Sequence, residues 1–119
     1  MPATRTNLPL DIDKVQARLR EFAHRRHWGQ FHSPKNLSMA LSVEVAELVE
    51  HFQWLTQEES KSLDLVKTEQ VAEELADIQI YLLMLADRLG VELESAVEAK
   101  IDKNAKKYPE GNSELTKRI

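Results

Sequence analysis

EVAELVEHFQW at residues 44–54 and ELADIQIYL at residues 74–82 are the two stretches that decide the fold. In both, apolar residues recur every three or four positions, which is the spacing of an amphipathic helix. Each stretch also carries two acids three residues apart, Glu44 with Glu47 and Glu74 with Asp77. The two stretches therefore predict two core helices, each with a pair of acids beside its apolar stripe.

The rest of the chain also has the composition of a helical protein. Only three glycines and four prolines occur among 119 residues, which favours long helices over turn-rich β structure. We predict a single all-α domain, folded as a four-helix bundle-like protomer. Its helices are expected over about 11–27, 34–54, 68–89 and 92–107. The polar segment 56–66 is expected to be a loop with room for a short helical turn, and residues 1–10 and 112–119 to be flexible tails.

Composition also excludes several classes of protein. The absence of cysteine removes disulfides, thiolate catalysis and thiolate metal sites. A formal net charge of -4 argues against binding to a nucleic-acid polymer, whose phosphates attract basic proteins. No apolar run approaches the roughly 18 residues of a membrane span, and MPATRTNLPL at the start lacks the apolar stretch of a secretory signal. We therefore expect no membrane partner and a cytoplasmic location.

The position of the acids is more informative than their number. At about 100° per residue, Glu44 and Glu74 lie about 60° to one side of their apolar stripes, with Glu47 and Asp77 about 60° further round. Acids at such a half-buried edge need a partner. One explanation is pairing with Lys or Arg. The other, equally weighted at this point, is a divalent cation such as Mg²⁺, which takes carboxylate oxygens and favours phosphate-bearing ligands.

The core-facing stripes can be read from the same periodicity. They are expected to be Leu41, Val45, Leu48 and Phe52 on the first core helix, and Val71, Leu75, Ile78, Leu82, Leu85 and Leu89 on the second. After Asp77 the second helix is apolar on nearly every side, with Leu83 among the residues off the stripe. Because four helices of one small chain can hardly enclose it, we expect a homodimer or homotetramer.

Several other residues fit both a structural and a ligand-binding interpretation. Lys100, Asn104 and Lys107 share one helical face, which is ordinarily solvated surface but would also suit a cationic clamp on phosphates. Trp28 and His32 lie in the linker before the first core helix, and Trp54, at the end of that helix, is placed by its helical wheel next to the acids. Aromatic residues of this kind usually pack at the rim of a core, and beside a metal and phosphate site they would stack on a nucleobase.

Longer motifs around the acids resemble a known family. The spacing Glu44-x-x-Glu47 followed by Glu74-x-x-Asp77 resembles the ExxE…ExxD signature of the MazG-like all-α nucleoside triphosphate pyrophosphohydrolases. FHSPKNLSMALSVEVAELVEHFQW at 31–54 and KIDKNAKKYP at 100–109 are similar to the dCTP pyrophosphatase branch of that family. The resemblance covers about residues 12–109.

The resemblance implies hydrolysis of a nucleoside triphosphate, with dCTP or a related or modified dNTP expected, to the monophosphate and pyrophosphate. It implies Mg²⁺ as cofactor, with Mn²⁺ as a substitute, held by the four catalytic acids Glu44, Glu47, Glu74 and Asp77. Lys100, Asn104 and Lys35 match phosphate-contacting or basic positions, and Trp28, Trp54 and Tyr81 match positions near the base and sugar. His32 and Lys107, from the same segments, complete the expected substrate-binding set.

Two alternatives remain open from the sequence. One is a helical bundle without catalysis that binds nucleotides or a protein, its acids simply solvated. The other is a related all-α hydrolase acting on dUTP or on nucleoside diphosphates.

Overall fold

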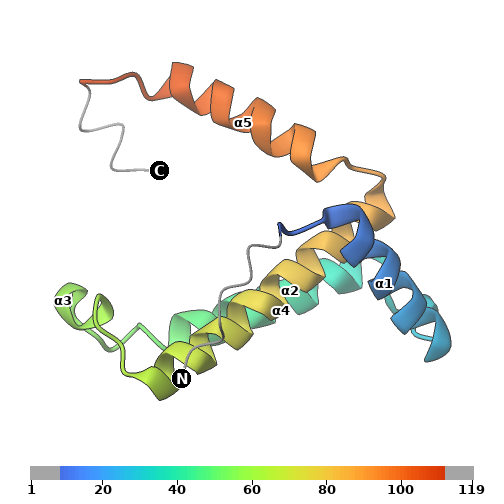
Figure 1. Ribbon diagram of the computed structural model, residues 1–119, viewed down its shortest axis with the longest axis horizontal. Coiled ribbons are helices and arrows are strands. Elements are labelled where there is room, and N and C mark those ends of the chain that lie inside the picture. The colour runs from blue at the N-terminus through green and yellow to red at the C-terminus, as the bar shows by residue number, and fades with distance from the viewer. Residues whose placement is uncertain (1–8, 112–119) are drawn as a thin grey trace. The chain divides into compact units, whose positions relative to one another are not determined.

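The computed structural model describes residues 9–111, and among these it contains helices and no β-strand (Figure 1). The elements are α1 (Ile12–Arg25), the 3₁₀ helix η1 (Gly29–Phe31), α2 (Pro34–Glu50), α3 (Gln57–Ser60), α4 (Leu65–Leu89) and α5 (Leu93–Lys107). The all-α prediction is confirmed. The expected tails at 1–10 and 112–119 fall outside the described residues, apart from Pro9 and Leu10.

The chain forms two compact units, one ending at Leu89 and the other beginning at Gly90, so α5 belongs to the second unit and is described by itself. The single-domain organisation expected from the sequence therefore stays a prediction. Within the described residues, none of the helices combines the length and the apolarity that crossing a lipid bilayer requires.

The helix starts follow from local side-chain caps. Asp11 accepts a hydrogen bond from the backbone N of Lys14 at 3.1 Å at the start of α1. Ser33 does the same for Asn36 at 3.2 Å at the start of α2, where Pro34 occupies the first helical position. Thr56 begins α3 with a reciprocal capping box, which explains why the polar segment 56–66 contains the short helical turn that the sequence allowed.

The end of α2 differs from the prediction. The α-helix ends at Glu50, not Trp54, and the chain continues through hydrogen bonds between residues three apart, from His51 to Leu48 and from Phe52 to Val49. Such bonds tighten the last turn of a helix. The helical wheel that put Trp54 beside the acids therefore does not extend to that residue, whose side chain is 86% exposed.

The core lies where α1 and α2 both pack on α4. Leu37 of α2 and Leu83 of α4 are each 1% exposed. Leu83, which was predicted to lie off the core stripe, is thus one of the most buried residues, whereas Leu75 and Leu89 of the predicted stripe are 53% and 56% exposed. The cause is that α1 covers a second side of α4, where the buried Gln16 donates from Nε2 to the carbonyl oxygen of Leu83 at 2.9 Å.

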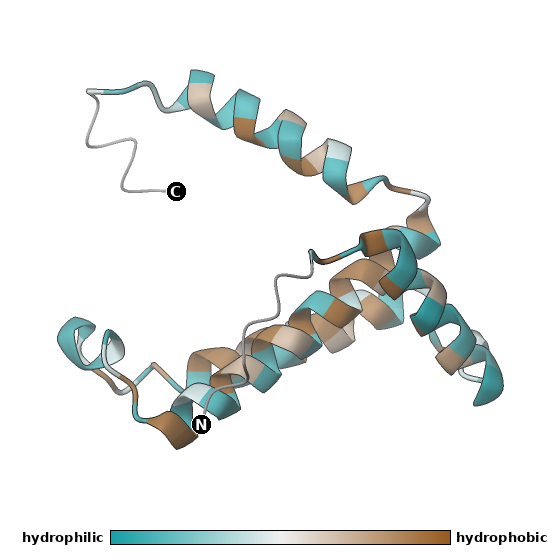
Figure 2. Ribbon diagram, viewed as in Figure 1, coloured by the Kyte–Doolittle hydropathy of each residue, from teal (hydrophilic) through white to brown (hydrophobic). Residues whose placement is uncertain are grey.

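Many apolar side chains remain exposed in the single chain. Figure 2 shows hydrophobic residues along much of α2 and α4. Met39 and Val43 of α2 are 57% and 55% exposed, and Ile101 of α5 is 55% exposed. Association of several copies would cover such side chains, and the homodimer or homotetramer expected from the sequence stays a prediction.

His27 occupies a strained position directly after α1, with φ at 55°. Its backbone N donates to His24, and the backbone N of Trp28 donates to Ala23. These two bonds form the Schellman motif, whose left-handed position favours glycine. We expect His27→Gly to raise the free energy of unfolding by about 0.5 to 1 kcal/mol, measured by chemical denaturation. The control, His24→Gly inside α1, should lower it, and a loss of stability in His27→Gly would contradict the interpretation.

Candidate active site

The two acidic edges predicted from the sequence meet between α2 and α4. One carboxylate oxygen from each of Glu44, Glu74 and Asp77 lies within 4.8 Å of the others. Glu44 and Glu74 are half-buried, whereas Asp77 is exposed. We call these three residues the acid cluster. Three of the four acids singled out from the sequence are thus brought together in space.

Two atoms of the acid cluster have no protein partner. Oε2 of Glu44 and Oε2 of Glu74 are buried and make no hydrogen bond. Among residues 9–89, the ion pairs join Arg20 to Asp87, Arg25 to Glu21 and Lys61 to Glu58, so none involves the cluster. Pairing with Lys or Arg, one of the two explanations considered for these acids, is therefore not found within residues 9–89. Buried carboxylate oxygens without partners are the donor set that suits a hard cation.

Glu44 is the most perturbed member of the cluster. Burial raises the pKa of Glu44 from its ordinary value to about 7, and the neighbouring carboxyl groups of Glu74, Glu47 and Asp77 act in the same direction. Glu47 therefore lies next to Glu44 although it is not one of the three converging acids. The metal-free cluster therefore holds a proton on Glu44 at pH values where an ordinary glutamate is ionised.

Aromatic residues of the α1–α2 linker form a second group. The ring of Trp28 makes edge-on contacts with Phe22 at 5.6 Å and with His32 at 6.0 Å between centroids. His32 is half-buried, and its Nδ1 is buried without a hydrogen-bond partner. Burial, followed by the positive charge of Arg88, lowers the pKa of His32, so its imidazole is neutral at physiological pH.

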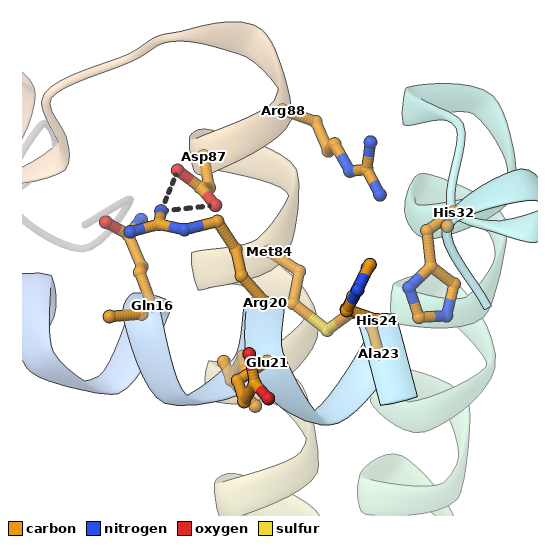
Figure 3. Close-up of a pocket in the computed structure, with 12 residues that line it drawn as sticks. Gln16, Arg20, Glu21, Ala23, His24, His32, Met84, Asp87 and Arg88 are labelled. Atoms are coloured by element: carbon orange, nitrogen blue, oxygen red, sulfur yellow. Dashed lines mark hydrogen bonds and ion pairs between the residues drawn. The ribbon is translucent and has the colours of Figure 1, made fainter. Parts of the chain in front are cut away.

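His32 also lines a cavity of about 670 Å³ between α1, the linker and the end of α4. Figure 3 shows Arg88, His24 and His32 arranged around this space, with Met84 beside them. One wall is fixed by Arg20, whose Nη1 lies 2.7 Å and 2.8 Å from the two carboxylate oxygens of Asp87. The cavity combines the apolar side chain of Met84 with the guanidinium of Arg88 and the imidazole of His32. This combination suits an aromatic ligand with polar groups at its edge.

Most of the residues that line this cavity were not predicted from the sequence. Arg20 and Asp87 are 67 positions apart, and no local pattern predicts that they meet. One sequence feature could have indicated the cavity. Gln16, Arg20 and Ala23 are spaced four and three residues apart, so two polar residues share the side of α1 that carries a buried alanine.

The remaining predicted substrate residues are placed less specifically. Tyr81 is half-buried one turn after Asp77 on α4, and Lys35 is exposed in the first turn of α2. On α5, Lys100 is exposed and Asn104 half-buried, while Nζ of Lys107 lies 5.3 Å from the ring centroid of Tyr108. Because α5 is described by itself, the phosphate contacts expected of Lys100, Asn104 and Lys107 stay predictions.

Comparisons with known proteins give consistent similarities. The model of the MazG-like family matches residues 39–118. dCTP pyrophosphatase 1 of Bos taurus is 48% identical over 101 residues, and that of Homo sapiens is 46% identical over the same length, covering 83% of this chain and 58% of each relative. The chain thus spans little more than half the length of these relatives. A solved structure of a pyrophosphatase from Archaeoglobus fulgidus matches with a TM-score of 0.79 and 38% identity, covering 90% of this chain and 100% of that one.

Proposed function

The chain belongs to the MazG-like family, and from this premise we propose that it hydrolyses a nucleoside triphosphate to the monophosphate and pyrophosphate. dCTP, or a related or modified dNTP, is the proposed substrate, because the similar proteins are dCTP pyrophosphatases. The observation that carries the proposal is the acid cluster with its two buried, unpartnered carboxylate oxygens. A role in maintaining the nucleotide pool, a cytoplasmic location and a homodimeric or homotetrameric state form part of the same proposal.

The acid cluster fits a divalent cation, and we assign Mg²⁺ to it, with Mn²⁺ as a substitute. Glu44, Glu74 and Asp77 supply hard oxygen donors within 4.8 Å of one another, and Glu47 lies next to them. When bound, the cation would supply charge neutralisation for the phosphates and acidify a water molecule. Without it, triphosphate oxygens and a cluster of carboxylates would repel one another.

Glu47 is the residue that we assign as general base. It is half-buried beside Glu44 and lies outside the three converging acids, so its carboxylate remains available to accept a proton. In the proposed reaction the oxygen of a water molecule attacks the α-phosphorus, and the bond from that phosphorus to the bridging oxygen breaks. The water proton passes to Glu47, and pyrophosphate leaves with the bond electrons.

The cavity beside His32 is the proposed place of the nucleoside. Met84, which lines the cavity, follows Asp77 by seven residues on α4 and therefore lies about 10 Å further along the same side of the helix. Arg88 and the unpartnered Nδ1 of His32 offer polar partners to the edge of a base. The ring of Trp28 lies next to His32, consistent with its expected place near the base or sugar.

A substrate panel tests the proposal and its two alternatives. Purified protein would be incubated with the common NTPs and dNTPs, including dUTP, and with dCDP, in Mg²⁺ or in EDTA. We expect Mg²⁺-dependent release of pyrophosphate, fastest from dCTP or a modified form of it, and loss of that release in Glu47→Gln. Preferential cleavage of dUTP or dCDP would favour the related all-α hydrolase. No turnover of any nucleotide would favour the binding bundle without catalysis.

The pKa of Glu44 predicts how cation binding depends on pH. Because the pKa is raised to about 7, Mg²⁺ must displace a proton below that pH, and its affinity should rise about tenfold per pH unit up to about 7 and then level off. The free energy of unfolding of the metal-free protein should fall as pH rises from the ordinary pKa of a glutamate to about 7. In this pH range the folded state binds more protons at Glu44 than the unfolded state does, so removing protons destabilises the fold.

Calorimetric titration of Mg²⁺ from pH 5.5 to 8.5 measures the first effect, and chemical denaturation in EDTA measures the second. Glu44→Gln, which cannot titrate, should lose the pH dependence of both. An Mg²⁺ affinity that stays constant from pH 5.5 to 7 in the unmodified protein would contradict the assignment of Glu44 to the cation.

A further inference from the structure

A second polar contact joins α2 and α4 away from the acid cluster. Nζ of Lys67, in the first turns of α4, lies 3.2 Å from Nδ1 of His51, which caps the end of α2. Both residues are half-buried. An ammonium group can only donate, so Nδ1 of His51 is the acceptor in this contact.

This contact is in register with the acid cluster. His51 follows Glu44 by seven residues on α2, and Lys67 precedes Glu74 by seven residues on α4. Seven residues are close to two full turns, so each pair shares one side of its helix at a separation of about 10 Å. The Glu44–Glu74 and His51–Lys67 contacts are therefore successive contacts along one seam between α2 and α4.

The His51–Lys67 contact offers hydrogen-bond donors without a neutralising acid. Lys67 appears in none of the ion pairs among residues 9–89, and its partner His51 accepts through Nδ1. The ammonium retains two further N–H donors, and His51 retains the N–H of Nε2. A half-buried ammonium without a counter-ion loses hydration that a bound anion would offset.

We propose that Lys67, positioned by His51, binds the terminal diphosphate of the triphosphate substrate and the pyrophosphate product; this rests on the proposed function. The two contacts are about 10 Å apart along the seam, a separation that the linked phosphoryl groups of a triphosphate can span. The opposite end of α4 borders the cavity assigned to the nucleoside, so the triphosphate would extend toward Lys67.

The experiment compares product inhibition in variants of Lys67 and His51. Lys67→Gln should raise KM for dCTP about tenfold and weaken inhibition by inorganic pyrophosphate about tenfold, because one charge-assisted hydrogen bond is lost. Inhibition by dCMP, which lacks the terminal phosphates, should not change. Lys67→Arg should retain most of the pyrophosphate inhibition. His51→Ala should raise KM less than Lys67→Gln does, with kcat nearly unchanged, as expected for a positioning residue.

The matched control is Lys61→Gln, which removes an exposed lysine that pairs with Glu58 and should change neither inhibition constant. Unchanged pyrophosphate inhibition in Lys67→Gln, or an equal loss of dCMP inhibition, would overturn the proposal. Thermal unfolding with Mg²⁺ and inorganic pyrophosphate tests binding independently of turnover. If the wild-type protein hydrolyses no nucleotide, the proposed function fails. In that case, stabilisation of the wild type by pyrophosphate that is lost in Lys67→Gln would still support the binding role of Lys67. If pyrophosphate does not stabilise the wild type, the binding role is overturned.

Discussion

Asp77→Asn is expected to lower kcat for dCTP by about a thousandfold or more while leaving the helices folded. Asp77 contributes one of the three converging oxygens of the acid cluster. An amide keeps the shape of the side chain but removes the negative charge that a divalent cation requires. Because Asp77 is exposed and its carboxylate makes no ion pair among residues 9–89, the substitution should change the free energy of unfolding by less than about 0.5 kcal/mol.

Glu73→Gln is the matched control for Asp77→Asn. Glu73 is an exposed acid on the same helix, four residues earlier, and it lies outside the acid cluster. Its replacement removes the same charge from α4 and should leave kcat within about twofold. Steady-state pyrophosphate release, measured with circular dichroism on both variants, gives the comparison. Equal activity of the two variants would remove Asp77 from the site.

Glu44→Gln is expected to have two large effects of opposite sign. In EDTA at pH 8 it should raise the unfolding temperature by about 4 °C or more, because a neutral amide replaces a half-buried carboxylate that lies beside Glu74, Glu47 and Asp77. In Mg²⁺ it should abolish both turnover and the stabilisation that the cation gives to the wild type. A residue that destabilises the free protein and is needed for activity is typical of a functional site.

Differential scanning fluorimetry across an Mg²⁺ series measures both effects of Glu44→Gln in one experiment. Glu50→Gln, on the exposed side of the same helix, is the control and should reproduce the wild-type response to Mg²⁺. If Glu44→Gln were less stable than the wild type in EDTA, the repulsion inferred within the acid cluster would be wrong.

Local periodicity indicated three of the residues that meet in the acid cluster, although it placed Glu47 with them as well. Glu44 on α2 and Glu74 on α4 occupy the same place relative to their apolar stripes, so packing of the two helices brings them together. The helix starts expected at about residues 11 and 34 likewise agree with the side-chain caps at Asp11 and Ser33. In each case the deciding interaction is either within one turn of helix or repeated along the helix.

The parts that could not be predicted depend on contacts between distant segments. The burial of Leu83 depends on α1, which covers a second side of α4. The helical wheel of α4 by itself placed that side outside the core stripe. The cavity beside His32 needs the ion pair between Arg20 and Asp87, and the His51–Lys67 contact needs the register between α2 and α4. Helical spacing shows which residues share a face of one helix, but it does not show which helix covers that face.

Phosphorus NMR of dCTP incubated with the protein and Mg²⁺ tests the proposed reaction most directly, because it identifies every phosphorus-containing product in one sample. Cleavage at the α-phosphorus next to the acid cluster predicts dCMP and pyrophosphate in equal amounts, with no reaction in EDTA or with Asp77→Asn. Formation of dCDP and inorganic phosphate, or an unchanged dCTP spectrum with the wild-type protein, would contradict it.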